Sequence, residues 1–144
     1  MKAVRVHEVH ERRLRGDGAE LIDHPERMWP SDRWPALRPE GLGFLRHELV
    51  EHEPGRRVTF RITGPRGLSG SHGWQLDGST MRHTVDAECT GLMRLGWPLV
   101  VKPIHSALHE DVLDRAEAAV GGTPAPRAFS PRVRMLRRAL RRLA

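Results

Sequence analysis

The 144-residue chain contains no tyrosine and only one cysteine, Cys89. A single cysteine excludes an internal disulfide, and the missing tyrosine excludes every mechanism that needs a phenol hydroxyl. The sequence also has no P-loop and no G-x-G-x-x-G pattern, so nothing in it indicates a nucleotide site. Cys89 has no basic cluster nearby in the sequence that would make it reactive, and we interpret it as a small core residue.

Long apolar runs are missing as well, because no stretch approaches the roughly 18 residues of a membrane span. With 38% hydrophobic and 29% charged residues, the composition is typical of a single soluble globular domain. Residues 1–5 alternate charged and apolar side chains and do not resemble a signal peptide. We therefore expect a cytoplasmic protein with one core.

Acidic residues are absent after Glu117, and this divides the charge of the chain. Seven of the 24 lysines and arginines follow Glu117, which leaves 17 basic and 18 acidic residues before it. The net charge of +6 therefore comes from the C-terminal segment, and nucleic-acid binding by the body of the protein is not favoured. We divide the chain into a domain over 1–122 and a Pro-containing linker with an Arg-rich amphipathic tail over 123–144.

The pattern over 131–144 predicts an amphipathic helix with a narrow apolar stripe. Such a helix suits an anionic membrane surface, which would make the protein peripheral at the membrane, or an acidic partner. The remaining interpretation is a solvated or frayed helix without a partner. The stripe consists of Val133, Leu136, Leu140 and Leu143.

Four segments between residues 45 and 89 alternate apolar and polar side chains, which predicts an antiparallel meander. Pro54-Gly55 and Asp77-Gly78 stand where tight turns would join neighbouring strands. Another strand is predicted over 3–13, with a slip in its alternation that suggests a bulge. The inward faces of the meander are Leu45, His47 and Leu49; Val58, Phe60 and Ile62; His72, Trp74 and Leu76; and Met81, His83 and Val85.

Residues 97–120 predict one long helix, because apolar side chains recur there at helical spacing. Pro103 fits only a first turn or a kink, so the regular helix begins near it or bends there. A long helix that follows a twisted antiparallel sheet has one economical position, across the concave face. The space between helix and sheet is then either core or a ligand cavity. The apolar stripe is Val101, Ile104, Leu108, Val112 and Ala119.

Four segments together resemble a known superfamily: EHEPGRRVTFRITGP (51–65), SGSHGWQL (69–76), STMRHTVDAECTG (79–91) and WPLVVKPIHSALHEDVLDRAE (97–117). In this order they resemble the START-like or SRPBCC superfamily, the polyketide cyclase/dehydrase and lipid-transport group. The resemblance implies an α+β helix-grip fold, in which a curved antiparallel sheet wraps around a long C-terminal helix and a hydrophobic cavity. The segment 33–44 departs from the pattern because it looks too short for additional strands, which predicts a smaller or open-edged cavity.

We expect this cavity to bind a small hydrophobic molecule, either a lipid or a polyketide-like compound, and we expect no cofactor. The residues expected to contact the molecule come from the inward strand faces and from the helix stripe. They are Phe60, Ile62, His72, Trp74, Met81, His83, Val85, Val101, His105, Leu108 and Val112.

Three of these side chains, His72, His83 and His105, are histidines that face the same space. They would orient a ligand carbonyl or hydroxyl or, in the alternative of a cyclase or dehydratase enzyme, move a proton on a bound substrate. Hydrogen-bonded core histidines are the structural interpretation, so no residue is assigned as catalytic. The remaining alternative is an interaction module that docks through its basic tail.

His105 and His109 stand four residues apart on the predicted helix, a spacing that can bind zinc. We expect His109 to turn toward a partly solvated edge of the helix, so the sequence assigns no metal site. Asp111 and Arg115 have the same spacing, and we interpret them as a helix-surface ion pair worth about 0.3–0.5 kcal/mol.

Overall fold

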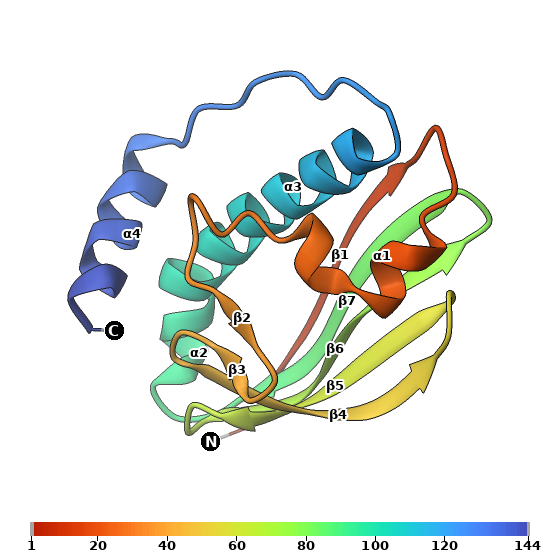
Figure 1. The fold of residues 1–144 in the computed structure, drawn as a ribbon. Helices are drawn as coiled ribbons and strands as arrows, with labels where there is room; N and C mark the ends of the chain where they lie inside the picture. Colours follow the sequence, from red (N-terminus) through yellow and green to blue (C-terminus); the bar gives the residue numbers. More distant parts are fainter. Residues whose placement is uncertain (1, 144) are drawn as a thin grey trace.

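A seven-stranded antiparallel sheet frames the protein, and residues 2–143 are the part of the chain that the computed structural model describes. The strand order is β1-β7-β6-β5-β4-β3-β2, so all neighbours except β1 and β7 are consecutive in sequence. The sheet curves around one long helix (Figure 1). Its strands are β1 (Val4–Arg13), β2 (Leu37–Arg38), β3 (Gly41–Leu42), β4 (Leu45–Glu53), β5 (Arg57–Gly64), β6 (Leu68–Asp77) and β7 (Thr80–Cys89).

The long helix across the concave face is α3 (Lys102–Ala119), which confirms the predicted placement (Figure 1). Pro103 lies in its first turn, one of the two positions that its ring allows. The residues before it wind less regularly, as the short helix α2 (Met93–Gly96) and a π-helical turn (Trp97–Val101). The predicted helix over 97–120 is therefore regular only from residue 102 onwards.

Two short elements follow β1 and lead toward β2. They are α1 (Ala19–Asp23) and a 3-10 turn (Pro25–Met28). The 3-10 turn contacts α3, and α1 contacts β5 and β6. This segment therefore closes one end of the space between helix and sheet.

The C-terminal helix α4 (Pro131–Leu143) follows an extended linker and contacts α3 (Figure 1). Its apolar stripe faces the body, because Val133 is buried and Leu136 and Leu140 pack against the main core. The interpretation of the tail as a solvated or frayed helix is therefore wrong for these three residues. The side chain of Leu143 lies outside the described part of the chain.

Strand β1 pairs with β7 without interruption along its whole length, so the expected bulge does not form. Val9 points outward and is exposed, and the inward positions are partly charged. Glu8 lies 3.3 Å from the ammonium of Lys102, and Arg12 donates to Glu110 at 2.8 Å. An edge strand can face inward with charged side chains here because α3 supplies the opposite charges.

The segment 33–44 contains the strands β2 and β3, which extend the sheet beyond β4. The prediction that this segment is too short for additional strands is wrong, because each of these strands needs only two residues. Gly41 makes the tight pairing possible. Its φ is +146°, and a Cβ there would lie 2.0 Å from the carbonyl oxygen of Leu45.

Buried apolar side chains form two clusters on the inner side of the sheet. The larger joins the segment 14–34, the inner faces of β5 to β7, α3 and Val133, whereas the smaller lies around Ile62, Val85 and Trp97. Cys89 belongs to the smaller cluster, and burial raises the pKa of its thiol, which fits a core residue. Within residues 2–143, no helix has the length and apolar character needed to cross a bilayer.

Candidate functional site

A cavity of about 680 Å³ lies between the concave face of the sheet and α3. Both apolar clusters contribute to its walls, together with β2, β3 and the loops that flank them. Pockets for small molecules have volumes of about 300–1,000 Å³, so this hollow is large enough for one. The space under the helix is therefore a cavity as well as a core.

Most of the side chains proposed from the sequence reach this cavity. Phe60, Met81 and Val112 do not line it, because they are buried within the larger cluster. Phe60 stacks under His47 with 4.2 Å between ring centres, which covers its ring. The lining residues among those proposed are Ile62, His72, Trp74, His83, Val85, Val101, His105 and Leu108.

Among the lining residues that were not proposed from the sequence are Trp29, Leu68, Trp97 and Ile104, and three further contributions are of particular interest. The segment 34–47 forms one wall. Leu140 of α4 contributes from the tail. His109 lines the cavity beside His105, so its expected position at a solvated helix edge is wrong.

A row of hydrogen-bonded histidines crosses the inner face of the sheet. His47 Nδ1 lies 2.8 Å from His72 Nε2, and His72 Nδ1 lies 3.3 Å from His83 Nε2. All three residues are buried. Burial lowers the pKa of His72 to about 3 and that of His83 well below its usual value, so these imidazoles are neutral at pH 7.

Helix α3 presents two more histidines to the end of this row. The His109 ring stacks on His83 with 3.6 Å between centres, and His105 lies 4.2 Å from His109. Neither ring nitrogen of His105 has a hydrogen-bond partner among residues 2–143. Burial lowers the pKa of His105 to about 3 and that of His109 well below its usual value. This end of the row is therefore neutral and contains several nitrogen atoms without hydrogen-bond partners among the described residues.

The predicted ion pair between Asp111 and Arg115 is wrong. Asp111 is buried and accepts a hydrogen bond from Trp34 Nε1 at 2.7 Å, with Arg33 at 3.4 Å. Arg115 instead donates to Asp32 at 2.6 Å. Helical spacing cannot show this outcome, because the partners come from the loop 29–36.

Comparison with solved structures identifies the fold. An uncharacterised protein from Rhizobium leguminosarum aligns with a TM-score of 0.51 at 17% identity, over 81% of this chain and 95% of that one. The chain has the helix-grip fold. The fold implied by the START-like resemblance is thus confirmed, with the curved sheet gripping α3 (Figure 1).

Two further solved structures align with lower TM-scores. CalU16 from Micromonospora echinospora aligns with a TM-score of 0.47 at 17% identity, over 96% of this chain and 84% of that one. An AHSA1-like protein from Rhizobium etli aligns with a TM-score of 0.44 at 18% identity, over 88% of this chain and 89% of that one. No family model and no curated protein matches the sequence. The function therefore has to be argued from the cavity.

Proposed function

We propose that the protein binds one small hydrophobic molecule, a lipid or a polyketide-like compound, in the cavity under α3. The observation that carries the proposal is the cavity of about 680 Å³ itself. Its walls are mostly aliphatic and aromatic, including Trp29, Leu68 and Ile104. Transfer of apolar surface from water into such walls contributes about 25 cal/mol per Å² to binding.

The histidines give the cavity one polar wall. Neutral imidazoles can donate or accept a single hydrogen bond and do not demand a charged partner. A molecule with an apolar body and a hydroxyl or carbonyl at one end therefore fits better than an ionic metabolite. The tryptophans and leucines around it favour a flat or flexible carbon skeleton.

The proposal is tested by filling the cavity. Val101 lines the cavity, whereas Leu99, in the same π-helical turn, is 54% exposed. We expect Val101→Trp to weaken the binding of an apolar fluorescent dye at least tenfold, while Leu99→Trp binds it normally. Native mass spectrometry of the purified protein checks in parallel for a co-purified compound that Val101→Trp lacks. Unchanged dye affinity in Val101→Trp would contradict the proposal.

A cyclase or dehydratase activity is the second candidate, and the free nitrogens of His105 favour it. The pKa of about 3 argues against it, because so weak a base abstracts protons poorly at neutral pH. Mass analysis of the bound compound before and after incubation distinguishes the two functions. An enzyme changes the mass or the isomer, and a binding protein returns the same molecule.

The tail supports an additional electrostatic contact with an anionic surface or acidic partner. Its apolar stripe is used inside the protein, so only the charged face is available for such a contact. Retention on anionic vesicles at two salt concentrations tests this role. If the protein is not retained even at low salt, the role is excluded. Besides Arg132, which donates to the carbonyl of Leu99, the exposed arginines of α4 are Arg134, Arg138, Arg141 and Arg142.

A further inference from the structure

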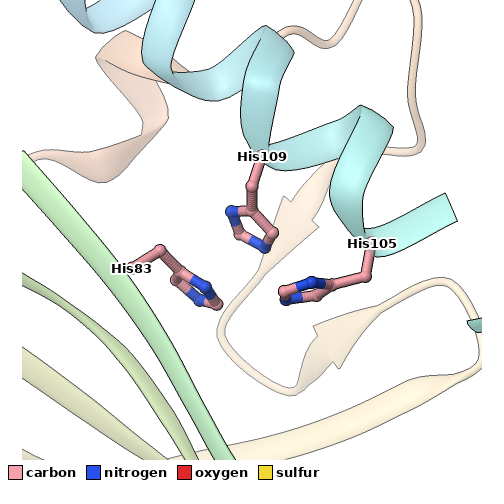
Figure 2. A group of neighbouring side chains, drawn as sticks. All are labelled: His83, His105 and His109. Carbon is pink, nitrogen blue, oxygen red and sulfur yellow. The ribbon is translucent and has the colours of Figure 1, made fainter. Parts of the chain in front are cut away.

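His83 on β7 and His105 and His109 on α3 form a cluster at the cavity wall. One ring nitrogen from each lies within 4.8 Å of one from each of the others. Figure 2 shows the three rings turned toward one another from the strand and the helix. His83 and His109 are 1% and 4% exposed, so water reaches the cluster only through the cavity.

The hydrogen-bonded row fixes which nitrogen of His83 carries its proton. The carbonyl oxygen of Arg38 can only accept, so His47 Nε2, 3.3 Å away, is the donor. Because His47 is neutral, its Nδ1 accepts from the Nε2–H of His72. His72 Nδ1 then accepts from the Nε2–H of His83. The Nδ1 atom of His83 is consequently a bare lone pair.

This lone pair is buried and has no hydrogen-bond partner in the described part of the chain. His109 Nδ1 and both ring nitrogens of His105 are likewise buried without a hydrogen-bond partner among the described residues. Buried polar atoms without partners are rare in folded proteins because each costs free energy. Four such atoms on three neighbouring rings indicate that the cluster is built to bind something.

A metal ion satisfies these atoms better than a hydrogen-bond donor would. A ligand hydroxyl can donate to one nitrogen, whereas an ion accepts a lone pair from all three rings. Metal-binding imidazoles must be deprotonated, and burial keeps these three neutral. Imidazole nitrogen is a preferred donor for Zn²⁺ and similar divalent transition metals.

We propose that His83, His105 and His109 bind a divalent transition-metal ion such as Zn²⁺, with the fourth coordination position open to the cavity. Three protein ligands and one open position characterise zinc sites that take water or substrate. Bonds of about 2.0–2.1 Å require the ligand nitrogens to move to roughly 3.4 Å from one another. His83 and His109, which stack at 3.6 Å, must also turn out of their stack.

The surroundings supply orientation and charge for the ion. The hydrogen-bonded row from Arg38 to His83 orients the His83 ring and fixes which of its nitrogens is free for the metal, as outer-shell partners of metal sites do. On the other side, the His10 ring lies 5.4 Å from that of His105. The Glu110 carboxylate lies 3.7 Å from His10 Nδ1 and brings a negative charge close to the cluster.

Titration of the chelator-treated protein with Co²⁺ and Zn²⁺ tests the proposal. We expect one ion per chain, a tetrahedral visible spectrum with Co²⁺ and a higher melting temperature with Zn²⁺. His105→Ala should lower the affinity by at least about 100-fold. The matched control is His24→Ala, which removes an exposed histidine and should leave the affinity unchanged.

Two variants of His72 test the row separately, because His72 supplies no ligand atom to the ion. His72→Leu removes the acceptor for His83 Nε2–H and should weaken Co²⁺ binding by about 10–100-fold. His72→Asn keeps an acceptor oxygen near the position of Nδ1 and should restore most of the affinity. Circular dichroism confirms that each variant is folded before titration.

Absence of one-to-one binding, or equal affinity in His105→Ala and the wild type, would overturn the metal site. The result is independent of the proposed hydrophobic ligand, since the ions are titrated alone and dye binding is measured without metal. A protein that binds dye but no ion retains the first proposal and loses this one.

Discussion

Asp111 shows how one buried residue ties a loop to the central helix. Its carboxylate, on α3, is 4% exposed and is held by the Trp34 indole N–H and the Arg33 guanidinium. A buried charge is tolerated only when such partners replace water. The wall of the cavity formed by the loop 29–36 is therefore positioned by polar contacts as well as by packing.

Trp34→Phe should destabilise the protein more than Trp29→Phe does. Trp34 donates to a buried carboxylate, a bond worth about 2 kcal/mol, whereas Trp29 donates to the neutral carbonyl of Pro35, worth about 1 kcal/mol. Both changes remove the same ring atoms from a buried site, which makes them a matched pair. Urea unfolding measures the difference, and equal losses would contradict the assigned role of Asp111.

At the scale of single residues, alternation along the strands places His72 and His83 correctly on the inner face. It predicts burial for Leu49, which pairs with the buried Phe60 and is nevertheless 55% exposed. No local pattern reveals that His109 faces His83. That contact depends on how α3 is rotated over the sheet.

At the scale of elements, α4 is part of the cavity wall rather than an appendage. Arg137 donates to the carbonyl of Arg33 and lies over the Phe129 ring, 4.2 Å from its centre. Arg132 donates to the carbonyl of Leu99 at 2.8 Å. This oxygen receives no helical hydrogen bond from residue 103, because proline has no N–H. Two of the tail arginines are therefore structural, although a sequence count treats all of them alike.

Val133→Asp should undock α4. The buried valine contributes about 1.5–3 kcal/mol to docking, and a carboxylate in its place cannot be buried without a partner. We expect hydrogen exchange in 131–143 to accelerate at least tenfold while β5 to β7 stay protected. Met135→Asp, at a position that is 62% exposed, is the control. Slow exchange in Val133→Asp would show that α4 is held in some other way.

The elements themselves are largely predictable from the sequence. The meander, its turns and α3 follow from periodicity and from Gly and Pro signals. Strands β2 and β3 do not, because two-residue strands carry no periodicity. Their pairing depends on the edge of β4 and on the close approach at Gly41, which are tertiary contacts and leave no local sequence pattern.

At the scale of the whole molecule, the buried histidines couple folding to pH. An unfolded histidine takes up a proton near pH 6.5, whereas His72 in the folded protein does so only near pH 3. The unfolded state therefore binds more protons as the pH falls. The contribution of His72 to stability is complete above pH 6.5 and is lost progressively between pH 6.5 and pH 3.

For the chelator-treated protein, we expect His72 and His105 each to lower the free energy of unfolding by about 2 kcal/mol between pH 7 and pH 5. His72→Asn removes one titrating group and should reduce the average slope between pH 7 and pH 5 by about 1 kcal/mol per pH unit. Urea titrations at pH 7, 6 and 5 measure both values. A flat profile in the wild type would contradict the neutral histidine row.

The four tryptophans of the chain, Trp29, Trp34, Trp74 and Trp97, all line the cavity. Because the protein has no tyrosine, its emission on excitation at about 295 nm, where phenylalanine does not absorb, originates at that wall. Anything that enters and displaces water from those indoles alters the colour or intensity of the emitted light. The molecule thus carries an intrinsic optical sensor of occupancy, with which compounds can be screened without any attached label.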